Sequence, residues 1–419
     1  MTTPEDRFEA DYILETTADP ARVAETMAGE QSSGTFVSVP GESAELKARS
    51  AARVVSCEVM ATDLPQSVPS AGVDPARRAS RARVTLSWPL DNIGPSLPNL
   101  VATVAGNLFE LRQVAGLRLE ALRLPPAFAE AYPGPAFGVG GTRRLAGVEA
   151  GPLIGTIIKP SIGFDPAQTA DLVDTLCAAG IDFVKDDELQ SAGPTCPFEA
   201  RVDAVMRAVD AHADRTGRKV MVAFNLTGDL DEMRRRHDHV LAAGGTCVMA
   251  SLNSVGIVGM VELRRHSALP IHAHRNGWGY LSRHPSLGWS FPAWSALWRL
   301  AGADHMHVNG LANKFAEEDG SVIAAARSCA EPLVDGAPMT VMPVFSSGQT
   351  VWQAAGTYEA LGTADLIHCS GGGILAHPDG PAAGVQALRH AWEAAIAGRP
   401  LADAAATDPA LAGAMTLKA

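Results

Sequence analysis

Residues 181–188, IDFVKDDE, join an apolar run typical of a buried β-strand to four charged residues at its end. Side chains two positions apart on a strand share a face, so Lys185 and Asp187 can point at one cation, with Glu188 turning in beside them. Carboxylate oxygens of this kind suit Mg²⁺. A protonated Lys185 would repel the cation, so it must be neutral or chemically modified to take part. The alternative is a solvated loop in which an aspartate caps the next helix.

From residue 150 to the end of the chain, short apolar runs alternate with helical segments. We predict eight strands, at 153–159, 181–186, 219–226, 246–252, 269–275, 304–309, 340–345 and 365–370. Eight βα units in about 250 residues match the size and count of a (β/α)₈ barrel. A doubly wound open sheet shows similar alternation, but the count of eight favours the barrel. The predicted fold class is therefore α/β, with a C-terminal (β/α)₈ TIM barrel.

The first third of the chain has a different pattern and predicts a smaller α+β domain. Strands are expected at 8–14, 52–62 and 80–88, and helices at 19–29 and 97–110. The proline-rich segment LPPAFAEAYPGPAFG, residues 124–138, then indicates a boundary. We therefore expect an N-terminal domain over residues 1–135 and a barrel with a C-terminal helical tail over residues 136–419.

The composition narrows the classes of partner and compartment. The 419 residues are 47% hydrophobic, with a net charge of −12 and no block of Lys or Arg, so we expect neither nucleic acid nor a membrane as a partner. No apolar run approaches the roughly 18 residues of a membrane span. The amino terminus is polar and acidic, unlike a secretory signal. Six scattered cysteines without a CxxC pair favour reduced thiols and a cytoplasmic protein.

Reactive or polar residues occupy nearly every predicted strand end, which is where barrel enzymes hold their catalytic groups. They are Lys159; Lys185, Asp187 and Glu188; Asn225; Ser251; His274 and Arg275; His307; Ser346, Ser347 and Gly348; and Gly371, Gly372 and Gly373. Solvation alone would supply polar strand ends, but not so many Lys, His and Arg side chains. The pattern therefore favours a functional site at the carboxyl ends of the predicted barrel strands.

Some of these strand ends allow two interpretations. Lys159 is either an acid–base group near a metal or a surface side chain whose stem covers apolar neighbours. Glycines in the loops FSSGQT (345–350) and CSGGGILAHPDG (369–380) let the backbone approach a phosphate, or they form plain turns.

Two other features are equally open. The histidine pairs on strands 269–275 and 304–309 favour hydrogen-bonding and phosphate-binding roles, with zinc as the alternative. The loop GLANKFAEEDG, residues 310–320, is either a closing lid that carries Lys314 or a flexible surface loop.

Together the motifs resemble the RuBisCO large-chain family, and the match runs along almost the whole chain. The segments are GEQSSGTF (29–36), AGNLF (105–109), GTIIKPSIG (155–163), GIDFVKDDE (180–188), HAHR (272–275), DHMHVNGLANKF (304–315), FSSG (345–348) and SGGG (370–373). The resemblance implies that Lys185 takes up CO₂ as a carbamate, which turns a repelling cation into an oxygen ligand. The carbamate, Asp187 and Glu188 would then bind Mg²⁺.

The resemblance also implies roles for the remaining residues. The catalytic set would be Lys159, which transfers a proton, with Lys185, Lys314 and His274. Residues that bind the phosphate and the rest of the substrate would be Glu30, Thr35, Asn107, Arg275, His307, Ser346, Gly348, Gly371 and Gly372. Because Glu30, Thr35 and Asn107 would reach into the active site of a partner subunit, we expect a homodimer or a multiple of dimers.

Four positions depart from carboxylating RuBisCO. Ser161 replaces a second lysine, Trp278 a histidine, Ser347 a glycine and Phe36 a tryptophan. They imply a RuBisCO-like protein that does not fix CO₂ on ribulose bisphosphate.

We therefore expect Mg²⁺-dependent decarboxylation of a phosphorylated branched 3-oxo sugar acid through an enediolate, as in apiose catabolism. Retention of Lys314 fits a substrate that carries a carboxylate. The alternatives are an enolase or isomerase of a (methylthio) sugar phosphate, transfer of the carboxyl group to water, and a non-catalytic paralogue.

Overall fold

The computed structural model describes residues 6–34 and 40–417, which form two compact units. The first unit contains the chain up to Pro133 together with Gly277–Leu300 and Pro332–Met339. The second contains Gly134–Asn276, Ala301–Glu331 and the chain from Thr340 onward. The first unit thus takes in two later segments that the sequence pattern did not indicate.

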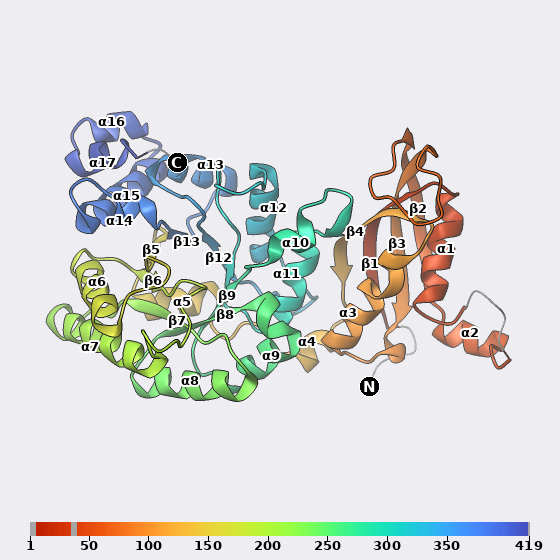
Figure 1. Ribbon diagram of the computed structural model, residues 1–419, viewed down its shortest axis with the longest axis horizontal. Helices are drawn as coiled ribbons and strands as arrows, with labels where there is room; N and C mark the ends of the chain where they lie inside the picture. The colour runs from red at the N-terminus through yellow and green to blue at the C-terminus, as the bar shows by residue number, and fades with distance from the viewer. Residues whose placement is uncertain (1–5, 35–39, 418–419) are drawn as a thin grey trace. The chain divides into compact units, whose positions relative to one another are not determined.

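The second unit is a closed barrel of eight parallel strands, which confirms the predicted fold class (Figure 1). The strands are β5 (Leu153–Ile157), β6 (Phe183–Lys185), β7 (Met221–Asn225), β8 (Cys247–Ser251), β9 (Ile271–His274), β11 (His305–His307), β12 (Met342–Phe345) and β13 (Ile367–Cys369). Each lies within one of the eight predicted ranges. Pairing of β13 with β5 closes the ring. All residues of β7 and β8 are buried, as expected for parallel strands covered on both faces, which explains why these segments are apolar throughout.

The helices of this unit lie between or after the barrel strands in sequence, except α5, which precedes β5 and adds Ala146 to the buried cluster of the barrel strands (Figure 1). They are α5 (Gly138–Ala146), α6 (Pro166–Ala178), α7 (Phe198–Thr216), α8 (Leu230–Ala242), α9 (Leu252–His266), α12 (Asp319–Ala330), the 3₁₀ helix η3 (Val351–Gln353), α13 (Ala354–Leu361), α14 (Gly372–Leu375), α15 (Pro381–Ile396), α16 (Leu401–Ala405) and α17 (Pro409–Ala414). Helix α6 shows how the sequence sets a helix start. Asp165 and Gln168 exchange side-chain to backbone hydrogen bonds there, and Pro166 follows the cap. Within residues 6–34 and 40–417, no helix is long and apolar enough to cross a membrane.

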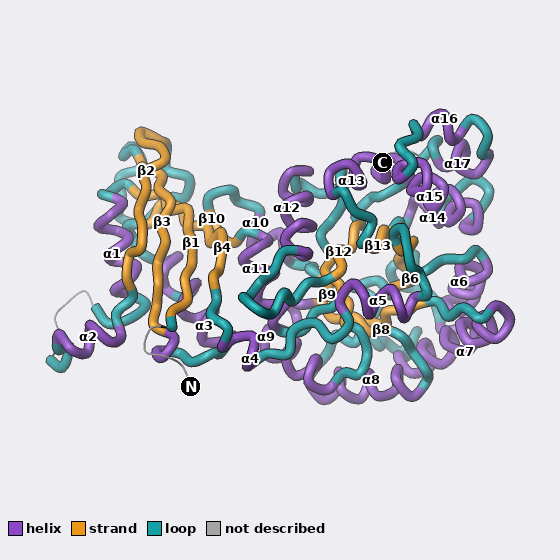
Figure 2. The backbone as a smooth tube through the Cα atoms, turned by 180° about the vertical axis from the view of Figure 1, so that it is seen from behind, coloured by secondary structure: helices purple, strands orange, loops and turns teal. Residues whose placement is uncertain are grey.

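The first unit is built on a five-stranded sheet with the order β10-β4-β1-β3-β2 (Figure 2). Its strands are β1 (Arg7–Thr16), β2 (Arg53–Leu64), β3 (Ala79–Pro89), β4 (Val114–Arg123) and β10 (Leu287–Trp289). Its helices are α1 (Pro20–Glu30), α2 (Ala44–Ser50), η1 (Leu90–Asn92), α3 (Leu97–Ala105), η2 (Asn107–Glu110), α4 (Ala127–Ala131), α10 (Trp278–Ser282) and α11 (Phe291–Leu300). Alternate residues of β1 are buried, and the hydroxyl of Tyr12 on that face donates to the Val104 carbonyl of α3 over 2.7 Å.

Two parts of this unit differ from the sequence-based expectation. The helix predicted over 97–110 ends at Gly106, whose φ of −57° and ψ of −110° are not helical, and a 3₁₀ turn follows. Strand β4 was not predicted, because its Leu, Arg, Ala and Glu residues favour a helix in isolation. Antiparallel pairing with β1 decides its conformation.

Candidate active site

The predicted catalytic and metal-binding residues of the barrel meet at the ends of β5 and β6. Lys159 lies two residues beyond β5, and its Nζ donates to Asp187 Oδ2 over 2.5 Å and to Ser161 Oγ over 2.7 Å. Lys185 ends β6, and its Nζ lies 2.7 Å from the Asp186 carbonyl and 3.5 Å from Glu188 Oε2. The two lysines and two carboxylates therefore form one cluster.

The two carboxylates of this cluster are held in their charged form. Burial alone would raise the pKa of Asp187, but the hydrogen bonds from Lys159 and the Leu189 N–H, together with the nearby charges of Lys159 and Lys185, outweigh burial and lower the pKa. Burial also opposes the charged form of Glu188, but the nearby His274 and Lys185, together with a backbone hydrogen bond, outweigh burial and lower its pKa. Two anionic oxygen ligands beside a buried lysine fit a hard divalent cation, provided that the lysine carries no positive charge.

The histidines continue the cluster toward β9, β11 and β12. His274 Nε2 lies 3.4 Å from Glu188 Oε2, and the rings of His274 and His307 are 4.7 Å apart. His307 Nε2 contacts the Ser346 hydroxyl. Burial, together with the nearby Lys185, lowers the pKa of His274 to about 4, and burial also lowers the pKa of His307 well below its usual value. Both rings are therefore neutral near pH 7 and can act as hydrogen-bonding groups.

The loops after β11 and β12 lie against each other. The backbone N–H of Lys314 donates to the Ser347 carbonyl over 3.2 Å. Gly348 has a φ of 88°, a left-handed conformation that favours glycine, and a Cβ there would lie in ordinary contact with Lys314, 3.5 Å away. The Lys314 ammonium lies 5.2 Å from the centre of the Phe315 ring, and both side chains are exposed.

The last glycine loop completes the ring of strand ends. Gly371 and Gly372 lie where β13 meets the short helix α14, and a Cβ at Gly371 would be 3.8 Å from Ile157 of β5. The structure thus brings the predicted barrel residues, from Lys159 to Gly372, to one end of the barrel.

The predicted residues of the first unit form a separate group. Asn107, at the start of η2, donates through Nδ2 to Oε1 of Glu30, at the end of α1, over 3.2 Å. Thr35 and Phe36 lie outside the described residues. Trp278, one of the four departures, packs against Phe291 and Trp294 with ring centres 5.6 and 5.0 Å away.

Sequence reasoning missed Arg201, and it counted Asn225 among the polar strand ends without giving it a role; both residues hold this site together. Arg201 of α7 is fully buried and donates to Asp186 Oδ2 over 3.2 Å and to the carbonyls of Ser191 and Cys196. Asn225, at the end of β7, donates through its amide to the carbonyls of Glu188 and Gln190. These bonds fix the loop that carries Asp187 and Glu188. The sequence shows only that an arginine lies in the helix after this loop. Periodicity alone assigns neither its burial nor its hydrogen-bonding partners.

A second group of potential metal ligands lies on helices α8 and α9. Asp238 Oδ1 is 3.0 Å from His237 Nδ1 and 2.6 Å from His266 Nε2. The Ala268 N–H donates to His237 Nε2 over 3.3 Å, so a neutral His237 carries its proton on Nδ1 and donates it to Asp238. This arrangement is a hydrogen-bonded surface group. In the described part of the chain, these three ligand atoms all lie within 4.8 Å of one another.

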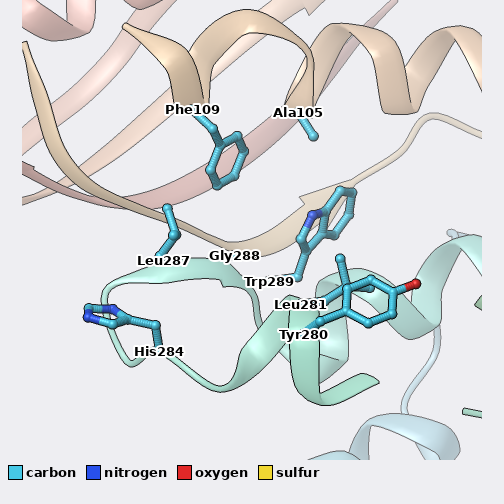
Figure 3. Close-up of a pocket in the computed structure, with 8 residues that line it drawn as sticks. All are labelled: Ala105, Phe109, Tyr280, Leu281, His284, Leu287, Gly288 and Trp289. Atoms are coloured by element: carbon cyan, nitrogen blue, oxygen red, sulfur yellow. The ribbon is translucent and has the colours of Figure 1, made fainter. Parts of the chain in front are cut away.

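The first unit contains an apolar pocket of about 270 Å³ (Figure 3). Ala105 and Phe109 lie on one side of it, and the segment from α10 to β10 forms the other (Figure 3). Its lining residues are Ala105, Phe109, Tyr280, Leu281, His284, Leu287, Gly288 and Trp289. The lining has no carboxylate and no Lys or Arg, so it lacks the groups that hold a phosphate or a hard cation.

Comparison with known proteins identifies the family of this chain. Models of the N-terminal and catalytic domains of the ribulose bisphosphate carboxylase large chain match residues 10–128 and 138–417. A Xanthobacter autotrophicus protein named 3-oxo-isoapionate-4-phosphate transcarboxylase/hydrolase is 64% identical over 98% of this chain and 99% of its own. A Rhizobium etli protein named 3-oxo-isoapionate-4-phosphate decarboxylase is 44% identical over 96% of each chain.

Solved structures show the same likeness. A RuBisCO-like protein from Burkholderia fungorum has a TM-score of 0.93 at 50% identity, covering 99% of this chain and all 100% of that one. A dimeric archaeal Rubisco from Hyperthermus butylicus has a TM-score of 0.83 at 28% identity, covering 99% of this chain and 96% of that one.

Proposed function

The chain belongs to the ribulose bisphosphate carboxylase large-chain family, and we propose that it breaks the bond to the carboxylate of 3-oxo-isoapionate 4-phosphate or a close analogue. The observation that carries this proposal is the 64% identity, over 98% of the chain, to a relative named for that substrate. The departures at Ser161 and Ser347 support a reaction other than ribulose bisphosphate carboxylation.

The chemistry of a 3-oxo acid suits the residues at the strand ends. When the carboxylate leaves as CO₂, the electron pair of the broken C–C bond moves into the neighbouring carbonyl and leaves an enediolate. In our proposal Lys159 returns one proton to the carbon, which would complete a decarboxylation. In our proposal Lys314 holds the carboxylate, and Gly348, Gly371 and Gly372 hold the phosphate.

A second outcome starts from the same enediolate. The carboxyl carbon can form a new bond to the other enediolate carbon, after which water cleaves the product into two acids. The relative named transcarboxylase/hydrolase is more similar to this chain than the relative named decarboxylase, at 64% against 44% identity. That difference favours transfer and hydrolysis over release of CO₂.

Mg²⁺ is the cation that fits the donor set. A carbamate on Lys185, formed from the neutral amine and CO₂ with loss of one proton, would join the charged carboxylates of Asp187 and Glu188 as its ligands. When bound, Mg²⁺ would stabilise negative charge on the substrate oxygens. Asn225 and Arg201 would keep the loop that carries the carboxylates in place.

We also propose that the active protein is a homodimer or a multiple of dimers. Glu30 and Asn107 lie together in the first unit, with a 3.2 Å hydrogen bond between their side chains. In this proposal both residues complete the barrel site of a partner subunit.

The test follows the carboxyl carbon. The enzyme is incubated with Mg²⁺, bicarbonate and 3-oxo-isoapionate 4-phosphate labelled with ¹³C at the carboxylate, and the products are followed by NMR. Transfer and hydrolysis leave the label in an organic acid, whereas decarboxylation moves it into CO₂ and bicarbonate. Lys185→Ala should abolish both outcomes. Lys219→Ala is the matched control, because Lys219 pairs with Asp210 before β7.

Persistence of labelled substrate, together with turnover of a methylthio sugar phosphate, would show the enolase or isomerase alternative instead. Deuterium uptake from D₂O without any loss of the carboxylate would point the same way.

A further inference from the structure

A largely enclosed carboxylate from the loop after β11 already pairs with the arginine that follows β9. Glu317 Oε2 contacts Arg275 Nη2 and accepts a hydrogen bond from Asn309 Nδ2 over 2.6 Å. Glu317 Oε1 accepts from the Ser321 hydroxyl over 2.9 Å. Only 5% of the Arg275 side chain and 14% of the Glu317 side chain are exposed. Arginine, amide and hydroxyl donors thus surround one anion.

This set of donors can bind either a carboxylate or a phosphate. Guanidinium groups bind carboxylate and phosphate with the same planar fork, and amide and hydroxyl donors satisfy the remaining oxygens. The donors lie beside predicted substrate-binding groups, because Asn309 also accepts from the Ser347 hydroxyl over 2.8 Å and Ser346 contacts His307. A phosphate arriving here would have to displace the carboxylate of Glu317.

Glu317 is tied to its loop as well as to Arg275. The Asn313 amide donates to the carbonyls of Gly310 and Glu317, both over 3.0 Å. These bonds hold the backbone of Glu317 within the loop that carries Lys314. An incoming second phosphate faces both repulsion from the carboxylate and the cost of breaking its hydrogen bonds with Asn309 and Ser321.

We propose that Glu317 is a specificity-determining residue whose carboxylate fills an anion position at Arg275, so that the site accepts a ligand with one phosphate and rejects a second. The proposal rests on the proposed function, in which the substrate carries a single phosphate. The substrate in the family's name, ribulose bisphosphate, carries two. An internal carboxylate in the second anion position would account for that difference.

The experiment compares two unreactive ligands that differ by one phosphate, 1,5-pentanediol monophosphate and 1,5-pentanediol bisphosphate. Calorimetry measures the dissociation constant of each for the full-length protein with Mg²⁺ and bicarbonate. The wild type should bind the bisphosphate no more tightly than the monophosphate. Glu317→Gln, which keeps a hydrogen-bonding group but removes the charge, should tighten bisphosphate binding relative to monophosphate by about tenfold or more.

Glu318→Gln is the matched control. It makes the same charge change one residue away, at an exposed side chain, and should leave the ratio of the two dissociation constants unchanged. Glu317→Asp keeps the charge and should keep the wild-type preference. Thermal unfolding checks that each variant is folded, and Glu317→Ser serves if the Gln variant is not.

If both wild type and Glu317→Gln bind the monophosphate, and the ratio of the two dissociation constants is the same in both proteins, the inference is overturned. The proposed function would still stand. Failure of every variant to bind the monophosphate would contradict the proposed function, and the inference with it.

Discussion

At the scale of single residues, the two lysines at the barrel mouth have different surroundings. The Lys185 side chain is only 2% exposed, whereas that of Lys159 is 44% exposed and bonded to Asp187. A lysine that touches both solvent and the carboxylate cluster is suited to carrying a proton to a substrate. Lys185, enclosed between Asp186 and Glu188, is suited to a fixed ligand role after carbamylation.

The prediction at this scale concerns Lys159→Met. The kcat for 3-oxo-isoapionate 4-phosphate should fall by about a hundredfold or more, because the proton donor is lost. Mg²⁺ affinity, measured by calorimetry, should stay the same or rise, because Lys159 no longer competes for Asp187. Ser161→Ala, which removes the other partner of Lys159, is the control and should change kcat far less. Loss of Mg²⁺ binding in the Met variant would argue for a structural role instead.

At the scale of elements, the loop between β6 and α7 carries the carboxylates proposed to bind the metal, and side chains from other elements hold it in place. Arg201 joins Asp186 to the carbonyls of Ser191 and Cys196, and Asn225 holds the carbonyls of Glu188 and Gln190. A helix and a neighbouring strand thus determine where the loop lies. Side chains that hydrogen-bond to the ligands of a metal commonly influence the metal affinity of the site.

Arg201→Lys tests this support. A lysine keeps the charge but cannot make the same set of hydrogen bonds, so Mg²⁺ affinity should weaken by about tenfold or more. Arg207→Lys, an exposed position on the same helix, is the matched control. Calorimetric titration with Mg²⁺ and bicarbonate gives the comparison. Equal affinities for the two variants would show that the loop holds its shape without Arg201.

At the scale of the whole molecule, the predicted residues fall into two groups on different units. Lys185 belongs to the barrel, and Glu30 and Asn107 belong to the first unit. If each active site takes its barrel from one subunit and Glu30 from the other, defects in the two groups should complement each other.

We therefore expect Lys185→Ala and Glu30→Ala proteins, each inactive alone, to recover activity when mixed under conditions in which subunits exchange. Random pairing leaves one intact site in each hybrid dimer, or about a quarter of wild-type activity. Two differently tagged copies, purified in sequence, verify the hybrid. A purified hybrid without activity would contradict shared sites.

The sequence by itself determined the barrel and the identity of its strand-end residues. Apolar runs at a regular spacing are a local property, and all eight strands lie within the ranges that this spacing predicts. Strand ends must gather at one side of a parallel barrel, so Lys159, Asp187 and His274 could be grouped before any distance was known.

Only the tertiary structure decided which side chains from distant segments pair. Glu317 and Arg275 are 42 residues apart, and Arg201 and Asp186 are 15 apart, so no periodicity connects them. Strand β4 shows the same effect in the backbone, because pairing with β1 overrides the helical preference of its residues. The physical reason is common to these cases. Burial makes an unpaired charge or backbone group costly, and folding alone determines which partner is near enough to satisfy it.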